Sequence, residues 1–199
     1  MRTSPAFARN FEPITQVLSQ YLPATGVVLE VASGPGEHLC AWAARFHELH
    51  WLPSDLDAQA RESISARLET LQLGNVTEPL AIDLSRQDWP TQVPMSPDVI
   101  VGVNVLHISP WTATLGLFRG ARQCLAENGV LLVYGPFLRV AHSVPSNDAF
   151  SAQLRSQDAN WGVRDLAVVE GAAAQHGMSI REVHEMPANN LILALSVDG

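Results

Sequence analysis

Short apolar runs alternate along the chain with segments in which apolar residues recur at helical spacing. Ile14, Val17, Leu18 and Tyr21 follow the i, i+3, i+4, i+7 pattern, which predicts an amphipathic helix that ends near Pro23. Helical spacing recurs at 39–46, 64–71, 117–125 and 165–177, and strand-like runs lie at 26–31, 50–52, 79–82, 99–103 and 130–133. Strands that alternate with helices predict a parallel sheet with helices on both faces.

The C-terminal part of the sequence departs from this alternation. Two apolar runs, at 180–186 and 191–197, are separated only by residues 187–190. A parallel crossover needs a dozen residues or more, so this spacing predicts a hairpin. We therefore expect an α/β fold, a Rossmann-like doubly wound sheet of seven strands that is mostly parallel with an antiparallel last strand.

Small and acidic residues follow the first three predicted strands. Ala32, Ser33, Gly34 and Gly36 come after the first strand, where small residues let the backbone approach a ligand and turn into a helix. Asp55 ends the second strand, at the place where a carboxylate accepts hydrogen bonds from the two ribose hydroxyls of an adenosine. It also fits the N-cap of the next helix.

Asp83 ends the third predicted strand, where its carboxylate is placed to accept a hydrogen bond from an adenine amino group. Capping the turn before Asp88 is the other role that its position allows.

The glycine turn also indicates which adenosine cofactor fits. A dinucleotide-binding loop needs a third glycine where this chain has Leu39. Glu30 and Glu37 place negative charge beside the turn, which disfavours a pyrophosphate. Both observations favour a cofactor with a cationic centre and no phosphate, namely S-adenosylmethionine.

The order of these features resembles class I S-adenosylmethionine-dependent methyltransferases, with Ala32 in place of the first glycine of their usual motif. More narrowly, the chain resembles the methyltransferase-like twenty-six family. The matching segments are Arg9-Asn10-x-x-Pro13-Ile14, Leu29-Glu30-Val31-Ala32-Ser33-Gly34-x-Gly36-x-His38, Trp51-x-Pro53-Ser54-Asp55, Asn104-x-x-His107-x-Ser109-Pro110, Trp161-Gly162-x-Arg164-Asp165 and Met186-Pro187-Ala188-Asn189-Asn190. The resemblance implies the fold and the cofactor, and it leaves the substrate open.

Further cofactor contacts are expected around these segments. Asn104, at the end of the fourth strand, is expected to hold the methionine amino group. Arg9 and Asn10 precede the first helix and are expected over the cofactor carboxylate, unless they form a free arm. The complete expected cofactor set is Arg9, Asn10, Glu30, Ala32, Ser33, Gly34, Gly36, His38, Asp55, Leu56, Asp83, Leu84 and Asn104.

Methyl transfer is an in-line displacement, for which the protein positions the acceptor and removes its proton. His107 is the candidate general base, with a structural histidine as the equally weighted alternative. Tyr134 is a second candidate, unless it is a core residue with its hydroxyl at the rim.

Substrate contacts are expected from two segments. Residues 135–161 lack clear periodicity and are expected to form a lid-like insertion, and a hairpin turn follows near the C-terminus. Trp161 also fits a purely structural anchor, and asparagines suit turns on their own account. The expected substrate residues are Phe137, Asn147, Trp161, Asn189 and Asn190.

The charge of the chain excludes several function classes. Its 199 residues include 12 Lys+Arg, all of them Arg, and 20 Asp+Glu, for a net charge of −8. Lysine-based catalysis and a Walker-type loop are excluded, and the acidic balance argues against nucleic acid as a partner. Cys40 and Cys124 fall within predicted helices, and the histidines lack metal-ligand spacing, so we expect no disulfide and no metal.

These features predict one methyltransferase domain over 1–199, with an N-terminal arm and helix over 1–25. Without a signal core or an apolar run of about 18 residues, we expect a cytoplasmic monomer or homodimer that binds no membrane. The predicted function is S-adenosylmethionine-dependent methyl transfer to a small molecule. A non-catalytic cofactor-binding or regulatory protein of the same fold is the alternative, and an NAD-dependent oxidoreductase is a third.

Overall fold

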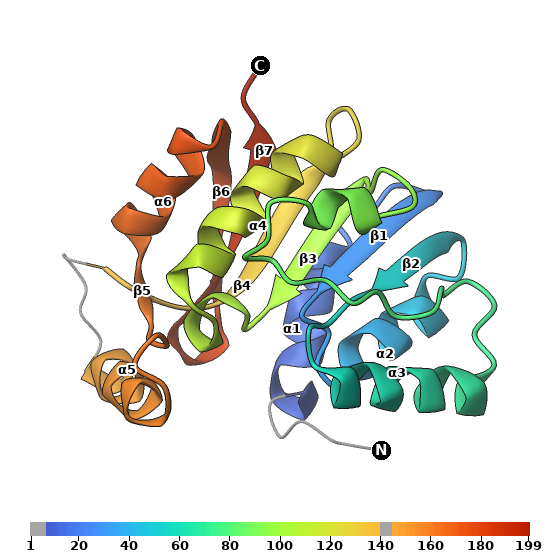
Figure 1. Cartoon of the computed structure of the whole chain (residues 1–199), viewed down its shortest axis with the longest axis horizontal. Coiled ribbons are helices and arrows are strands. Elements are labelled where there is room, and N and C mark those ends of the chain that lie inside the picture. The colour runs from blue at the N-terminus through green and yellow to red at the C-terminus, as the bar shows by residue number, and fades with distance from the viewer. Residues whose placement is uncertain (1–6, 140–144) are drawn as a thin grey trace.

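The computed structural model describes residues 7–139 and 145–199, and it contains one seven-stranded sheet (Figure 1). The strands are β1 (Gly26–Val31), β2 (Leu49–Pro53), β3 (Val99–Val103), β4 (Val130–Leu138), β5 (Arg164–Asp165), β6 (Met178–Met186) and β7 (Asn190–Val197). Their order is β2-β1-β3-β4-β7-β6, and β5 pairs with β4 outside this path. β1 to β4 run parallel, and β7 is antiparallel to both β4 and β6. The expected fold class is confirmed.

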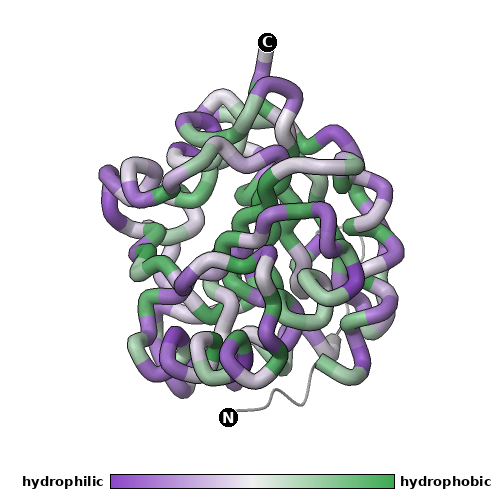
Figure 2. Tube along the Cα trace, turned by 90° about the vertical axis from the view of Figure 1, so that its right-hand side faces the viewer, coloured by the Kyte–Doolittle hydropathy of each residue, from purple (hydrophilic) through white to green (hydrophobic). Residues whose placement is uncertain are grey.

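Successive residues of each strand enter different hydrophobic clusters, because side chains alternate between the faces of a sheet. Leu29, Ile100 and Leu131 pack in one cluster, and their neighbours Val28 and Val99 pack in the other. Figure 2 shows the hydrophobic segments gathered along the sheet, with hydrophilic segments around them. Nearly continuous apolar strands are therefore explained by burial on both faces.

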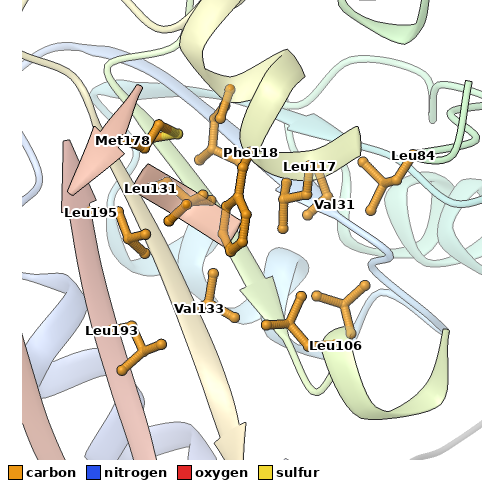
Figure 3. Close-up of a cluster of buried hydrophobic side chains, with 14 of the residues drawn as sticks. Val31, Leu84, Leu106, Leu117, Phe118, Leu131, Val133, Met178, Leu193 and Leu195 are labelled. Atoms are coloured by element: carbon orange, nitrogen blue, oxygen red, sulfur yellow. The ribbon is translucent and has the colours of Figure 1, made fainter. Parts of the chain in front are cut away.

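Among the described residues, five helices cover the two faces of the sheet: α1 (Phe7–Leu18), α2 (Glu37–Arg45), α3 (Ala58–Leu71), α4 (Trp111–Cys124) and α6 (Leu166–Gln175). A further helix, α5 (Pro145–Gln157), lies beyond the carboxyl end of the sheet (Figure 1). α1, α2 and α3 contribute Ile14, Leu39 and Ile64 to one cluster. α4 contributes Leu117 and Phe118 to the other, where Figure 3 shows them beside the side chains of β4. No helix among the described residues is long and apolar enough to cross a membrane.

The strand order places a topological switch point between β1 and β3. The chain passes from β1 to β2 on one side and returns to β3 on the other side of β1. The loops that follow β1 and β3 therefore diverge at the carboxyl edge of the sheet, where open α/β sheets bind ligands.

Three expectations about secondary structure are wrong. Arg9 and Asn10 do not precede the first helix but lie within α1, because Phe7 and Phe11 extend its packing onto α2. Residues 79–82 form no strand: Leu80 makes only an isolated bridge with Ser54, and Pro79 has no N–H to donate to a ladder. The seventh strand is instead the two-residue β5. The segment 135–161 is not irregular throughout, because β4 continues to Leu138 and α5 begins at Pro145. Residues 1–6 of the expected arm and 140–144 of the expected lid lie outside the described residues.

A glycine in α4 allows a close contact between this helix and a buried tryptophan. Trp89 is fully buried and donates a hydrogen bond from Nε1 to the carbonyl oxygen of Gly116, at 2.9 Å. Its indole lies so close to Gly120, one turn further along α4, that a Cβ there would overlap the ring. The small residue at position 120 is therefore required by packing.

We expect Gly120→Ala to lower the free energy of unfolding by about 1–3 kcal/mol, because overpacking forces Trp89 or α4 to move. Gly171→Ala in α6 is the matched control, since a Cβ there meets nothing within 4 Å. It should stabilise the protein by about 0.5–1 kcal/mol through helix propensity. Urea unfolding measures both, and a Gly120→Ala protein as stable as the wild type would contradict the packing.

Candidate functional site

The loop after β1 adopts left-handed backbone conformations at three positions. Ala32, Gly34 and Gly36 have φ angles of 51°, 54° and 81°. Glycine adopts such angles without strain, whereas Ala32 does so at a cost of roughly 1 kcal/mol. A Cβ at Gly36 would approach Ile64 Cγ1 to 2.8 Å, but one at Gly34 would meet nothing within 4 Å. Gly34 therefore leaves open space at the surface of a cavity.

Asp55 connects the loops that follow β1 and β2. Its Oδ2 accepts a hydrogen bond from the backbone N–H of Gly34, and its Oδ1 accepts one from that of Asp57, both at 2.8 Å. The N-cap of α3 is Asp57, which accepts from Gln59 N at 3.0 Å, so the helix-cap alternative for Asp55 is wrong. Each carboxylate oxygen retains a second lone pair for a ligand.

Asp83 combines the two roles that its position allows. Its Oδ1 accepts hydrogen bonds from the backbone N–H and the hydroxyl of Ser85, at 2.9 and 2.6 Å, and so caps a turn. Its Oδ2 accepts none from the described residues. One oxygen thus fixes the side chain and the other remains available for a ligand that donates a proton.

These residues surround a cavity of about 380 Å³ at the switch point, here called the switch-point cavity. Its lining residues come from the ends of β1, β2 and β3, from the 82–85 turn and from the start of α4: Ala32, Gly34, Asp55, Leu56, Ile82, Asp83, Leu84, Ser85, Val103, Val105, Ile108, Ser109, Pro110 and Ala113. It brings together six of the expected cofactor residues. Asn104 and His107 were expected from the segment 103–113, but its residues that line this cavity were not, although their place directly after a strand is the signal that could have identified them.

A second cavity, of about 520 Å³, lies beside α5 and is here called the α5 cavity. Its polar lining residues are Arg9, Asn10, Asn104, His107, Tyr134, Asn147 and Asn190. Its other lining residues are Ile108, Pro136, Phe150, Pro187 and Ala188. Ile108 lines both cavities, so the two adjoin at this residue.

Seven expected site residues line neither cavity: Glu30, Ser33, Gly36, His38, Phe137, Trp161 and Asn189. Phe137 lies in the core because Pro136 takes the cavity side of β4, and side chains alternate along a strand. Asn189 is exposed, and its carbonyl oxygen accepts a hydrogen bond from Asn147. Trp161 is partly buried away from both cavities, with its backbone N–H bonded to Asp158 O.

His38 supports the site indirectly. Its Nε2 lies 2.9 Å from Asn10 Oδ1, and burial lowers the pKa of the imidazole to about 4. The ring is therefore neutral near neutral pH, and Nε2–H is the donor in this bond. The contact fixes Asn10 and the start of α1 against α2. Tyr134 lies next to them, and burial raises the pKa of its hydroxyl while a hydrogen bond to Asn10 opposes the rise.

His107 is buried, with 5% of its surface exposed, and lies in a short 3-10 helix at Leu106–Ile108. The ring contacts Phe150 edge-on at a centroid distance of 5.7 Å, and neither ring nitrogen bonds to another described residue. Burial, and secondarily the positive charge of Arg164, lowers its pKa to about 4. The imidazole is therefore neutral above about pH 5 and carries a lone pair that can accept a proton.

Arg164 holds the segment that carries His107. Its Nε donates to Leu106 O at 3.0 Å, and its guanidinium also donates to Ser109 O at 2.6 Å. The N–H of Gly162 donates to His107 O at 2.9 Å. These three bonds fix the segment on either side of the imidazole. Arg164 is not among the site residues expected from the sequence, although it belongs to one of the motifs that carry the family resemblance.

Metal-ion chemistry has no obvious site in the described part of the chain. No group of three or more His, Cys, Asp or Glu side chains comes together there. Both cysteines are free, and Cys40 is buried. His142 lies among the residues that the structure does not describe.

Comparison with known proteins identifies the family and the fold. The family described as "Protein of unknown function (DUF938)" matches residues 1–196, so the chain belongs to it. An O-methyltransferase family protein from Burkholderia thailandensis has a similar structure, with a TM-score of 0.80 at 17% identity, over 98% of this chain and 58% of that one.

Two ligand-bound structures have the same fold. The O-methyltransferase NcsB1 from neocarzinostatin biosynthesis, in complex with S-adenosylmethionine and 2-hydroxy-5-methyl naphthoic acid, has a TM-score of 0.74 at 19% identity, over 98% of this chain and 58% of that one. The methyltransferase CalO1 from calicheamicin biosynthesis, with S-adenosylhomocysteine bound, has a TM-score of 0.72 at 18% identity, over 97% and 56%. The chain spans little more than half of these proteins.

Glu30 makes stability depend on pH. Its side chain is 2% exposed, and Oε2 has no hydrogen-bond partner. Burial raises its pKa from 4.5 to about 8, a hydrogen bond from Ser33 opposes the rise, and the charge of Asp55 adds to it. Because the folded protein holds this proton more tightly than the unfolded chain, stability is lost as the pH rises from about 5 to about 8.

In the wild type, we expect the free energy of unfolding to fall by up to about 1.4 kcal/mol per pH unit over this range. Glu30→Gln should abolish this fall, because glutamine has no proton to lose. Glu69→Gln, at an exposed position of α3, should keep the wild-type pH dependence. Urea unfolding at pH 5, 6.5 and 8 measures the three proteins. Parallel curves for wild type and Glu30→Gln would contradict a buried, protonated carboxyl group.

Proposed function

We propose that this member of the DUF938 family is an S-adenosylmethionine-dependent methyltransferase that acts on a small molecule, and that it belongs to the methyltransferase-like twenty-six family. The observation that carries the proposal is the placement of Asp55 and Asp83 on one cavity at the switch point, directly beside a second cavity that contains His107. A cofactor cavity that adjoins an acceptor cavity is what a group-transfer enzyme requires.

The residues of the switch-point cavity fit an adenosine with a cationic sulfonium centre. Asp55 can accept both ribose hydroxyls, and Asp83 Oδ2 can accept the adenine amino group. Leu56 is 64% exposed at the cavity, which leaves an apolar side chain for the face of the adenine ring. The open space at Gly34 lets a ligand approach the backbone. Among the described residues, no Arg lines this cavity, which disfavours a pyrophosphate.

When bound in the switch-point cavity, S-adenosylmethionine would supply an electrophilic methyl group, and the electrons of the broken carbon–sulfur bond would remain on S-adenosylhomocysteine as a neutral thioether. Ile108 lines both cavities and Asn104 lines the α5 cavity, where the two side chains orient the acceptor toward this group. The neutral imidazole of His107 takes the proton that the acceptor hydroxyl loses as its oxygen bonds to carbon. Arg164 positions His107 for this step and keeps it neutral.

The similar structures support methyl transfer to oxygen, because they include an O-methyltransferase family protein and the O-methyltransferase NcsB1. A non-catalytic cofactor-binding protein is the second candidate function. Ala32 favours it, since a strained alanine replaces glycine in the loop that adjoins the cofactor. Cofactor binding without methyl transfer to any acceptor would distinguish this candidate from the enzyme.

Calorimetric titration with S-adenosylhomocysteine tests the cofactor site. We expect Asp55→Ala to weaken binding by roughly 10- to 150-fold, the effect of losing a charged hydrogen bond of about 1.5–3 kcal/mol. Asp57→Ala is the control, because it removes the N-cap of α3 and lowers stability without changing the cavity lining. Equal affinities of the wild type and Asp55→Ala would show that the ribose lies elsewhere.

The role of His107 is tested with the methyl-labelled cofactor and a pooled small-metabolite extract. We expect His107→Gln to lower label transfer by about 10²- to 10⁴-fold, the range for loss of a general base. S-adenosylhomocysteine affinity should remain within twofold of wild type, because the imidazole lines only the α5 cavity. Full label transfer by His107→Gln would assign the histidine a structural role.

A further inference from the structure

The α5 cavity has an electrostatic character opposite to that of the protein. The chain carries a net charge of −8, yet no Asp or Glu is among the residues that line this cavity. Among the described residues that line it, Arg9 alone carries a permanent charge, because His107 is neutral. A cationic ligand would find no counterion there, whereas an anionic ligand would.

Arg9 is available to a ligand. Across the described residues, no carboxylate forms an ion pair with its guanidinium, and the side chain is exposed at the cavity. Its positive charge lowers the pKa of Tyr134, against the effect of burial, so the two side chains lie close together. An unpaired guanidinium beside a cavity is well suited to bind a carboxylate.

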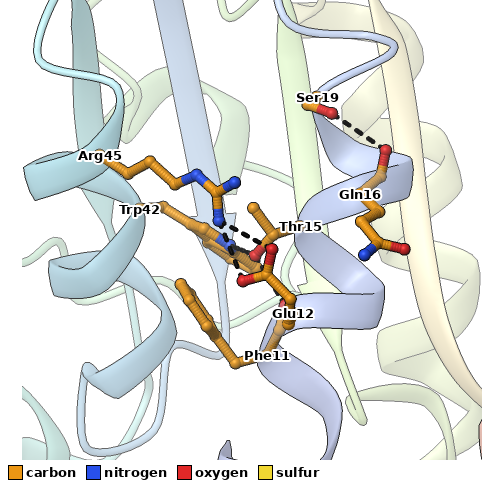
Figure 4. Close-up of polar contacts among 7 residues, drawn as sticks. All are labelled: Phe11, Glu12, Thr15, Gln16, Ser19, Trp42 and Arg45. Atoms are coloured by element: carbon orange, nitrogen blue, oxygen red, sulfur yellow. Dashed lines mark hydrogen bonds and ion pairs between the residues drawn. The ribbon is translucent and has the colours of Figure 1, made fainter.

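The position of Arg9 is fixed by the anchoring of α1 on α2. Trp42 Nε1 donates to Thr15 Oγ1 at 2.8 Å, and Arg45 forms an ion pair with Glu12 at 3.0 Å (Figure 4). Asn10 adds its bond to His38. Arg9 therefore belongs to a helix that is held at its place beside the cavity.

The other walls of the cavity favour a flat, apolar ligand body with a hydroxyl group. Phe150, Pro136 and Pro187 supply apolar surface. The amide nitrogens of Asn147 and Asn190 donate to backbone carbonyl oxygens, which leaves their Oδ1 atoms as acceptors for a ligand hydroxyl. The volume of about 520 Å³ is ample for a molecule of one or two rings.

We propose that the α5 cavity binds a hydroxyaryl carboxylate as the methyl acceptor, with its carboxylate on Arg9 and its hydroxyl group toward His107. This inference rests on the proposed function and adds the class of acceptor. The methionine part of the cofactor also carries a carboxylate. Arg9 lines only the α5 cavity, beside α5 and the β6–β7 turn, which favours the acceptor over the cofactor as its partner.

Calorimetry with protein saturated with S-adenosylhomocysteine tests the acceptor class. The probes are 4-hydroxybenzoate, salicylate and 1-hydroxy-2-naphthoate, with 4-hydroxybenzamide as the uncharged and tyramine as the cationic counterpart. We expect one or more of the three carboxylates to bind at least tenfold more tightly than 4-hydroxybenzamide. Tyramine should bind more weakly than that carboxylate and more weakly than the amide. Failure of all three carboxylates, or equal binding of acid, amide and amine, overturns the inference.

The variant Arg9→Gln identifies the partner of the guanidinium. It should abolish the preference for carboxylate over amide, whereas Arg181→Gln, the same charge change at an exposed position of β6, should preserve it. If Arg9→Gln instead weakens S-adenosylhomocysteine but not 5′-methylthioadenosine, which lacks the amino-acid part, Arg9 binds the cofactor and the inference is wrong. A wild-type protein that binds no S-adenosylhomocysteine refutes the proposed function itself, so the two failures are distinguishable.

Discussion

The hydrogen bond between Gly34 N–H and the Asp55 carboxylate, at 2.8 Å, is the interaction on which the candidate site depends. The strand order makes the loops after β1 and β3 diverge, and this bond joins the β1 loop to the end of β2, the strand on the side of β1 away from β3. A second bond, from Ser33 N to Ser54 O at 2.8 Å, reinforces the connection. The carboxylate that is expected to hold the ribose thus also shapes the loop that leaves room for the cofactor.

The segment between β3 and α4 gives the site its second half. It lies between the two cavities, contributes Ile108 to both and carries His107. Arg164 and Gly162 hydrogen-bond to the backbone of this segment, although they are distant from it in the sequence. Arg164, for example, lies 58 residues after Leu106. The segment held by these bonds faces both cavities. The protein therefore sets the position of the acceptor relative to the cofactor before either ligand binds.

Local sequence patterns predicted the features that depend on neighbouring residues in the sequence, namely most strands and helices and the residues at strand ends. Alternation of apolar runs with helical spacing predicted the sheet, and Gly34 and Asp55 were identified from their positions after strands. The strand expected at 79–82 failed because Pro79 and a short pairing segment allow only one bridge. α5 escaped prediction because its buried positions Asn147, Ser151 and Leu154 are mostly polar, which hides the hydrophobic periodicity of a helix. Arg164 acts through contacts that are distant in sequence, which no local pattern contains.

A crystal structure of the protein with S-adenosylhomocysteine tests the central claim most directly. We predict that the ribose hydroxyls bind Asp55, that the adenine amino group binds Asp83 Oδ2 and that the sulfur lies near Ile108, where the two cavities adjoin. An adenosine bound elsewhere, or a sulfur that points away from the α5 cavity and His107, would contradict it.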